Sequence, residues 1–170
     1  NKASKEMQNR ILKDLNEKIS SLPWLGTFHS VCAKLLRRHA EAVGLNSKFT
    51  IIDQEDQLRL IKNICKAENL DIKKISPKFV LSFINQWKNK GQLPENVLTK
   101  KGAPLEKAIL NVYKFYQERL RILNSCDFGD LILLCVSMFE KNSDILDLYL
   151  NNFKYILVDE YQDSNYIQSK

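Results

Sequence analysis

Two adjacent carboxylates, Asp159 and Glu160, carry the strongest chemical signal in the sequence because they directly follow a short apolar run. In open α/β sheets, ligands gather at the carboxyl ends of the strands. Unpaired acids at the end of a buried strand are costly, so a cation or phosphate site is the natural explanation. One carboxylate can hold Mg²⁺ while its neighbour orients or deprotonates a water. The alternative is a surface strand end followed by a helix cap at Asp163 or Ser164, and spacing alone favours neither interpretation.

A nucleotide site built on these acids also needs a phosphate-binding loop. The GxxxxGK[ST] form requires two glycines five residues apart, the second followed by lysine. No two glycines of the sequence are five apart and none precedes a lysine; they are Gly26, Gly44, Gly91, Gly102 and Gly129. The 170 residues therefore cannot cradle a triphosphate through such a loop.

Thr27, His29 and Ser30 stand where an expected extended segment gives way to a helix. Hydroxyl groups, an imidazole and the free N–H groups of a helix start suit phosphate binding. An ordinary helix N-cap beside a passive histidine explains the same residues, and the isolated motif favours that simpler interpretation. No Ser/His/Asp or Cys/His arrangement has supporting context, so nucleophilic catalysis is not expected.

Hydrophobic periodicity predicts that helices make up most of the chain. Expected helices cover 3–19, 28–43, 53–65, 76–91, 109–123, 131–138 and 145–149, with a loop over 92–104. Two runs lack the helical period, at 22–27 and 154–159. The continuous apolar character of the second indicates a strand covered on both faces, as in a parallel sheet. The expected fold class is mainly α, with about two short parallel strands at these positions.

The composition is that of an ordinary globular protein, with 44% hydrophobic and 27% charged residues and a net charge of +6. That charge is uneven: residues 1–40 carry +5, 41–104 carry +4 and 105–170 carry −3. A basic first half indicates contact with a polyanion, although solvated helix faces explain the charge equally well.

The cysteines and the first residues of the chain indicate the cellular compartment in which the protein is expected. Cys32, Cys65, Cys126 and Cys135 show no CxxC pair and no metal-ligand spacing. Each sits in an apolar helical pattern, so buried reduced thiols and a reducing, cytoplasmic compartment are expected. The apolar runs are too short to span a membrane. The chain begins with Asn and has no basic-then-apolar leader, so we expect a piece cut from a longer protein or a processed chain, not one secreted by a recognisable signal.

Five segments, read together, resemble the UvrD/Rep/PcrA-type superfamily 1 DNA helicases over essentially the whole chain. The sequence VDEYQDSN at 158–165 resembles motif II, the Walker B segment, with Ser164 where Thr is common. The other four are 1–7 (end of motif Ia), 26–30 (motif Ib), 52–58 (start of helical subdomain 1B) and 127–131 (the DFxDL element). Five matches in the family's order and at plausible separations are highly specific.

The resemblance implies roles for individual residues. Asp159 would hold Mg²⁺, Glu160 would activate the attacking water, and Gln162 would couple events within the nucleotide site. Contacts with single-stranded DNA are implied for Asn1, Lys2, Thr27 and His29. The implied cofactors are ATP and Mg²⁺. Walker A is expected before residue 1 and motifs III to VI after Lys170, so the isolated chain is expected to be inactive as an ATPase and to bind neither cofactor.

The resemblance also divides the chain. Residues 1–37 and 127–170 are expected to be pieces of the first RecA-like ATPase domain, and 38–126 a helical 1B-like subdomain. The parent is expected to be an ATP-dependent enzyme that moves 3′→5′ on single-stranded DNA and unwinds duplex. Its expected partners are single-strand/duplex junctions and the missing RecA-like parts of the same chain, with no membrane. Two alternatives remain: the helicase part of an AddA/RecB-like helicase-nuclease, and a non-enzymatic DNA- or protein-docking module.

Overall fold

The computed structural model of the chain describes residues 2–14, 22–70, 75–99 and 102–170. It is mainly helical with one small parallel sheet, as predicted. No helix among these described residues is both long and apolar enough to cross a membrane. The elements in chain order are α1 (Lys2–Asp14), α2 (Phe28–Arg38), η1 (Ala40–Val43), β1 (Thr50–Ile51), α3 (Gln54–Ala67), α4 (Pro77–Asn89), η2 (Pro94–Asn96), α5 (Pro104–Ile122), β2 (Ser125–Cys126), α6 (Phe128–Lys141), α7 (Ser143–Asn152), η3 (Tyr161–Asp163) and α8 (Tyr166–Ser169).

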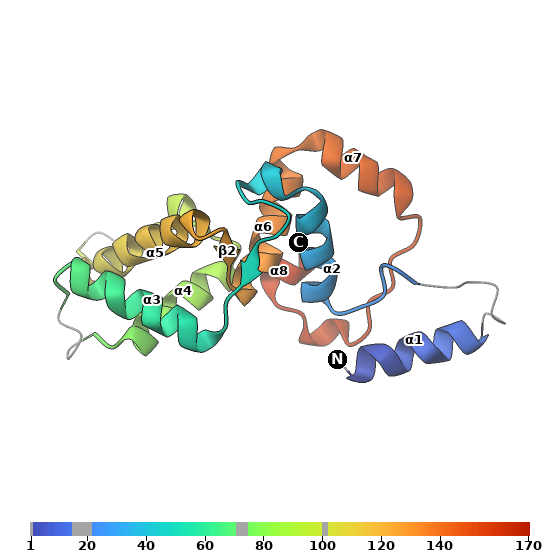
Figure 1. Ribbon diagram of the computed structural model, residues 1–170, viewed down its shortest axis with the longest axis horizontal. Helices are drawn as coiled ribbons and strands as arrows, with labels where there is room; N and C mark the ends of the chain where they lie inside the picture. Colours follow the sequence, from blue (N-terminus) through green and yellow to red (C-terminus); the bar gives the residue numbers. More distant parts are fainter. Residues whose placement is uncertain (1, 15–21, 71–74, 100–101) are drawn as a thin grey trace.

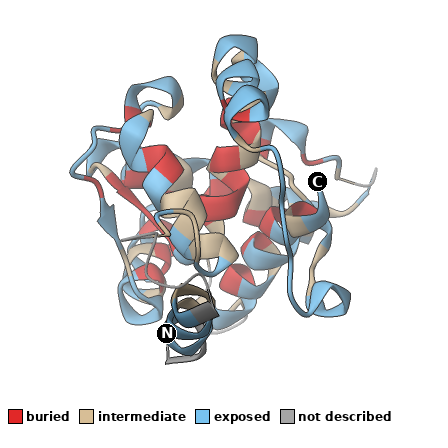
Figure 2. Ribbon diagram, turned by 90° about the vertical axis from the view of Figure 1, so that its right-hand side faces the viewer, coloured by how far each residue is buried: buried red, intermediate tan, exposed pale blue. Residues whose placement is uncertain are grey.

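The helices form two groups with separate cores. Helices α3, α4 and α5 pack together at one end of the molecule, and α2, α6, α7 and α8 lie toward the other (Figure 1). The first core centres on the fully buried Ile61, Ile84 and Val112. The second centres on Leu36 and Leu131. Figure 2 shows buried and exposed positions on different faces of the same helices, as amphipathic stripes require.

The chain crosses between the two groups twice, once before α3 and once after α5, and the sheet pairs these two crossing segments. β1 and β2 run parallel, with Thr50 opposite Ser125. Beside it, the Asn46 amide donates to Asn124 Oδ1 at 2.9 Å, and Asn124 Nδ2 donates to Asn46 Oδ1 at 2.7 Å. The chain is therefore fastened to itself where it enters and leaves the α3–α5 group.

Capping residues fix the helix starts close to the predicted positions. Asp53 caps α3 by accepting a hydrogen bond from the Asp56 amide at 2.9 Å. Ser76 caps α4, and Pro77 occupies its first turn, where no amide donor is needed. Gly91 follows α4 with φ +72°, a conformation that L side chains rarely adopt. The predicted bounds of α3 and α4 are thus confirmed to within a few residues.

The two predicted strands are wrong. A turn closed by a 3.2 Å bond from the Leu25 amide to the Leu22 carbonyl lies in the first, and 154–159 forms no strand. Tyr155 and Leu157 are 90% and 97% exposed. An apolar run says nothing about which strand would pair with it, and none of the described residues lies in a strand beside this segment. The parallel pair consists instead of β1 and β2, too short to show a pattern.

The cysteines are mostly buried. All four are free thiols: Cys65, Cys126 and Cys135 are buried and Cys32 is half-buried. The expectation of unpaired thiols packed among apolar residues is confirmed for three of them. Cys126 lies in β2 rather than in a helix, which corrects the predicted helical setting of that residue.

Candidate functional site

Asp159 and Glu160 lie in an exposed turn rather than at the end of a strand. Glu160 adopts a left-handed conformation, φ 50° and ψ 42°, and leads into η3. Such a conformation is uncommon for a non-glycine residue and is often found at functional sites. The Glu160 amide donates to Asp159 Oδ1 at 3.0 Å, and the Gln162 side-chain amide donates to Glu160 Oε2. The structure therefore brings the three predicted nucleotide-site residues together.

The donor set of this turn suits a hard cation. Magnesium prefers oxygen ligands and commonly takes only one or two carboxylates from a protein, the rest coming from phosphates and water. Asp159 and Glu160 offer two solvent-accessible carboxylates on adjacent residues. Gln162 holds one Glu160 oxygen, which limits the directions in which that carboxylate can point. These residues fit Mg²⁺ bound with nucleotide phosphates.

The segment that follows these acids is anchored on the end of α4. Asn165 caps α8: its Oδ1 accepts from the Gln168 amide at 3.1 Å, and its own amide donates to Gln168 Oε1 at 2.9 Å. The alternative prediction, that Asp163 or Ser164 caps the helix after the acids, is therefore wrong. Asn165 also donates to Asn89 Oδ1 at 3.4 Å, and a Cβ on Gly91 would lie 2.9 Å from Ile167 Cδ1. Glycine at 91 thus permits this close approach.

Thr27 and His29 open α2. Thr27 Oγ1 accepts a hydrogen bond from the Ser30 amide at 3.3 Å, so the helix-cap interpretation of this motif is confirmed. The His29 ring stacks on the Phe128 ring, with centroids 3.9 Å apart and planes inclined by 21°. Burial lowers the pKa of His29 below its usual range, which favours the neutral imidazole. The Phe128 side chain is 57% exposed, so this stack borders solvent.

All four predicted DNA contacts, those of Thr27, His29, Asn1 and Lys2, stay predictions. Asn1 and the Lys2 side chain lie outside the described residues. Phe128, which the sequence analysis did not single out as a site residue, is the partner that the structure places beside His29. It lies within the DFxDL-like element at 127–131, so the motif was visible in the sequence although the contact was not.

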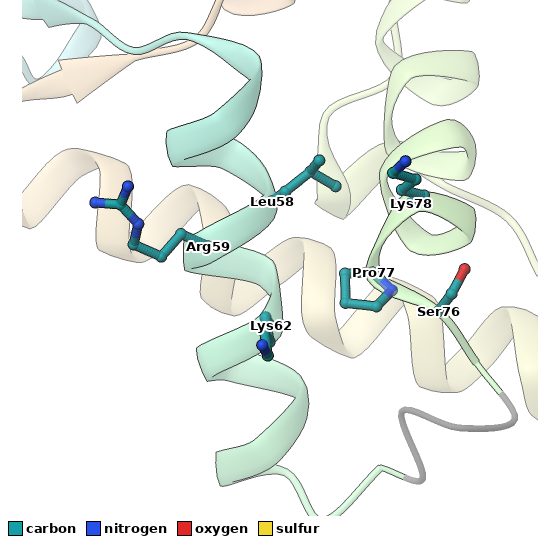
Figure 3. A pocket seen from close by; sticks show the side chains of 6 residues that line it. All are labelled: Leu58, Arg59, Lys62, Ser76, Pro77 and Lys78. Atoms are coloured by element: carbon teal, nitrogen blue, oxygen red, sulfur yellow. The ribbon is translucent and has the colours of Figure 1, made fainter.

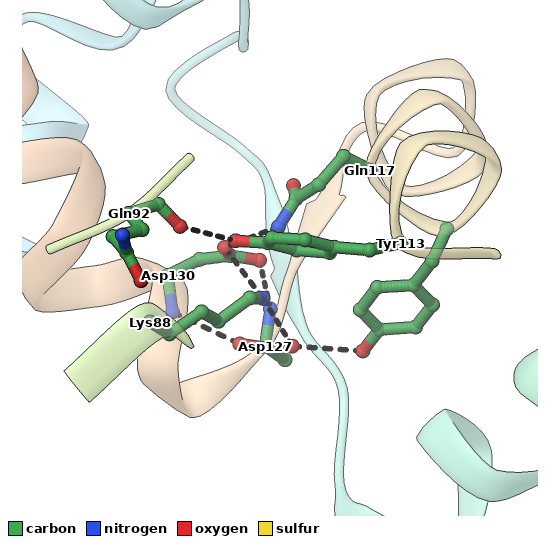
Figure 4. A network of polar contacts seen from close by, with 7 residues as sticks. Lys88, Gln92, Tyr113, Gln117, Asp127 and Asp130 are labelled. Carbon is green, nitrogen blue, oxygen red and sulfur yellow. Dashed lines mark hydrogen bonds and ion pairs between the residues drawn. The ribbon is translucent and has the colours of Figure 1, made fainter. Parts of the chain in front are cut away.

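A buried ion network, also unforeseen, lies where α4, α5 and α6 meet (Figure 4). Lys88 is 1% exposed, and its Nζ lies 2.6 Å from Asp127 Oδ2 and 2.7 Å from Asp130 Oδ1. Tyr116 Oη donates to Asp127 Oδ2 at 2.8 Å, and Gln117 Nε2 donates to Asp130 Oδ1 at 2.8 Å. The sequence carried one sign that Lys88 is buried: it lies four residues after Ile84, which lies four after Val80, and both of these are buried.

Each charge in this network depends on the others. Burial alone would lower the pKa of Lys88, but the carboxylates of Asp130 and Asp127 outweigh it and raise that pKa above its usual range. Burial opposes ionisation of Asp127, whereas the Lys88 charge and hydrogen bonds lower its pKa. Burial and the neighbouring Asp127 raise the pKa of Asp130. The Lys88 ammonium is therefore held in its charged form well into alkaline conditions.

A shallow basic pocket lies between α3 and the start of α4 (Figure 3). Its volume is about 450 Å³, and Leu58 and Pro77 contribute apolar surface. Arg59, Lys62 and Lys78 also line it, and the Arg59 side chain points away from α4 (Figure 3). The Arg59 guanidinium lies 3.6 Å from Asp56 Oδ1, an exposed contact within α3. The two lysines, Lys62 and Lys78, can hold phosphate oxygens.

Comparison with known proteins decides the family. The family model for the UvrD/REP helicase N-terminal domain matches residues 1–170. The chain belongs to this family. It is 43% identical over 171 residues to a probable DNA helicase II homolog of Rickettsia conorii, covering 99% of the chain and 26% of that protein. It is 39% identical over 168 residues to the ATP-dependent DNA helicase PcrA of Bacillus subtilis, covering 99% of the chain and 23% of that protein. The chain thus spans about a quarter of the length of these curated relatives.

The buried network includes the DFxDL-like element of this UvrD/REP family chain. The aspartates of the DFxDL-like element, Asp127 and Asp130, form a capping box at the start of α6. The same two carboxylates hold Lys88, which comes from the α3–α5 group. In this UvrD-like domain, the element therefore joins the two groups of helices.

Proposed function

We propose that the chain is the part of an ATP-dependent DNA helicase that supplies acidic residues to the ATPase site and contacts single-stranded DNA. The observation that carries this proposal is the family match over all 170 residues, which includes the exposed acids of the motif II-like segment. The whole enzyme would move 3′→5′ on one strand and unwind duplex. Residues 1–37 and 127–170 would belong to its RecA-like ATPase domain, and 38–126 would form a 1B-like subdomain.

In this proposal the exposed turn serves ATP hydrolysis. Asp159 would hold Mg²⁺, which when bound neutralises phosphate charge. Glu160 would accept the proton of the attacking water, and Gln162 would keep the Glu160 carboxylate oriented through their hydrogen bond. The sequence contains no GxxxxGK[ST] loop, so the 170-residue chain by itself would not turn over ATP.

The proposed contacts with single-stranded DNA gather at the start of α2. Thr27 and His29 would contact the strand there, with Asn1 and Lys2 contributing from the start of the chain. Phe128 exposes ring surface beside His29 and would stack on a base. The lysines of the basic pocket, Lys62 and Lys78, would contact phosphates of the duplex at a junction.

Fluorescence anisotropy with labelled single-stranded DNA at two salt concentrations tests the DNA-binding half of the proposal. Affinity should fall steeply with salt, because Lys and Arg contacts to phosphates release counterions. Phe128→Ala should weaken binding by about 1 to 3 kcal/mol, the contribution of one stacked base. His29→Ala should weaken it less, since the histidine edge is one contact among several.

Phe115→Ala is the matched control, because Phe115 is a partly exposed phenylalanine on α5, away from α2. Its affinity should equal that of the unaltered chain. Binding that is indifferent to salt, or equal losses in Phe115→Ala and Phe128→Ala, would contradict the proposed surface.

A further inference from the structure

Every carboxylate oxygen of Asp127 and Asp130 has a partner. Asp127 Oδ1 accepts from the Asp130 amide at 2.9 Å, and Asp130 Oδ2 accepts from the Asp127 amide at 3.1 Å. The two remaining oxygens share Lys88 and take one further donor each, Tyr116 for Asp127 and Gln117 for Asp130. No described buried side-chain nitrogen or oxygen is left unpaired. The first turn of α6 is therefore fixed from two helices, α4 and α5.

Such a network is not explained by stability alone. Burying charges costs solvation, and an apolar replacement of similar volume is often equally stable. A buried polar network specifies geometry instead, because its hydrogen bonds are satisfied in only one arrangement. What Lys88 gives this chain is a defined position for the turn that joins β2 to α6.

Phe128 lies between the two aspartates in that turn. Its neighbours Asp127 and Asp130 hold Lys88, and its own ring points to the other side and stacks on His29 of α2. A rotation of the first turn of α6 would move the Phe128 ring relative to His29. The position of the exposed ring pair thus depends on a lysine that is itself buried.

Gly129 completes the arrangement. A Cβ at this position would lie 3.1 Å from Lys88 Cδ and 3.4 Å from Asp127 Oδ1. Glycine therefore leaves room for the lysine stem to pass beside the turn. Packing, charge and hydrogen bonds all favour the same position of Lys88 against α6.

We propose that Lys88 is a positioning residue for DNA binding: from the α3–α5 group it sets the first turn of α6, so that Phe128 stays stacked on His29 and presents its exposed face to a base. This inference rests on the proposed contact of His29 and Phe128 with single-stranded DNA. Lys88 itself would touch no phosphate, because its side chain is buried.

Proton NMR of the histidine rings tests the positioning directly. The chain has two histidines, and His39 bonds Tyr149 away from this turn, with Nε2 3.0 Å from Oη. In the unaltered chain, the ring current of Phe128 should shift the His29 signals upfield. Lys88→Met keeps an unbranched side chain, one atom shorter, and removes the charge. It should move the His29 signals toward those of Phe128→Ala and leave His39 in place.

The same variants are then titrated with single-stranded DNA. Lys88→Met should lower affinity about fivefold or more, the scale of one lost stacking contact. The slope of log affinity against log salt should be unchanged, whereas loss of a phosphate-contacting lysine would reduce it by about one. Lys114→Met, an exposed lysine of α5, is the matched control and should change neither NMR signals nor base stacking.

A folded Lys88→Met protein with unchanged His29 signals and unchanged affinity overturns the inference. If the His29 signals move but neither Lys88→Met nor Phe128→Ala alters affinity, the positioning stands and the proposed DNA contact fails. If Lys88→Met does not fold, Gly129→Ala replaces it, because the added methyl presses on Lys88 and retains every charge. Unchanged His29 signals and affinity in Gly129→Ala would then overturn the inference.

Discussion

At the residue scale, Asp159 and Glu160 are neighbours with different expected roles. In the full-length helicase proposed above, Glu160→Gln keeps the size of the side chain and removes the proton acceptor. ATP turnover should drop by about two to four orders of magnitude, the usual effect of losing a general base. Binding of ATP and single-stranded DNA should survive. Asp159→Asn should instead weaken Mg²⁺-dependent nucleotide binding as well as turnover.

Hydrolysis rates and nucleotide dissociation constants for both variants separate these roles. Asp147→Asn, an exposed acid of α7, serves as the control and should behave as the parent does. The 170-residue chain alone should release no phosphate. A Glu160→Gln helicase that hydrolyses ATP within a few-fold of the parent rate would leave the two acids as an ordinary exposed turn.

Lys88 should impose an alkaline limit on stability. Its pKa is raised in the folded chain by Asp130 and Asp127, so above about pH 10.4 the unfolded chain loses this proton while the folded chain keeps it. The free energy of unfolding should therefore fall as pH rises through this range. The buried Tyr113 and Tyr116, whose pKa values are also raised, add to the same slope.

Urea unfolding at several alkaline pH values isolates the lysine contribution. Lys88→Met should show a shallower fall in the free energy of unfolding with pH, since the lysine no longer contributes, whereas the tyrosines and the buried thiols, whose pKa values are also raised, still do. The comparison concerns the slope, because the variant is less stable at neutral pH as well. Equal slopes for the two proteins would mean that the folded chain does not hold the Lys88 proton more tightly than the unfolded chain.

At the element scale, two helix caps of the same chemistry allow a matched comparison. Asp53 and Asp127 each accept a hydrogen bond from the amide three residues later, both at 2.9 Å. Asp53 is exposed, so Asp53→Ala should lower the free energy of unfolding by about 1 kcal/mol. Asp127→Ala should cost about 3 to 5 kcal/mol, because it also leaves Lys88 with one fewer buried counter-charge.

Denaturant unfolding of both variants measures this difference. Similar losses at the two positions would show that Asp127 acts only as a cap and that the contact with Lys88 adds little. A larger loss at Asp53 would contradict the burial of the network altogether.

The same elements show what the sequence could and could not predict. The starts of α3 and α4 were predictable because Asp53, Ser76 and Pro77 act on amides within their own first turn. A strand needs a partner from elsewhere in the chain, so the apolar run at 154–159 predicted a strand where the structure has none. Lys88 was missed for the same reason, since its partner Asp127 is 39 residues away.

In the candidate site too, the sequence predicts the local motifs but not the contacts between residues that are distant in the sequence. The acids at 159 and 160 and the pair Thr27 and His29 were recognisable from local sequence. The stack of His29 on Phe128 joins residues about a hundred positions apart, and no local pattern specifies it. The sequence could therefore identify the motifs but could not show which of them lie in contact.

At the scale of the whole molecule, the end of α4 connects regions that the motifs define separately. Lys88 holds the start of α6, beside the proposed DNA contact. Asn89 bonds Asn165, and Gly91 meets Ile167, both just after the motif II-like acids. A shift of the α3–α5 group would therefore move the end of α4, and with it both the start of α6 and the segment that follows the motif II-like acids.

The exposed apolar segment at 155–158 should drive association of the isolated chain. Ile156 is 76% exposed and Leu157 is 97% exposed, and both lie in a run with high β-propensity and free backbone groups. Contiguous exposed apolar surface of this kind favours contact between copies. Leu157→Lys should lower the tendency to associate, because a lysine on an exposed edge opposes strand pairing.

Sedimentation velocity over a range of concentrations measures this effect. Leu98→Lys is the matched control, because Leu98 is 92% exposed but has no exposed apolar run around it. Both variants add one positive charge, so a general effect of charge on solubility would act equally on the two. Less association in Leu157→Lys alone identifies the segment at 155–158 as the contact. Equal association in all three proteins would place the contact elsewhere and show that this segment, although exposed, does not pair.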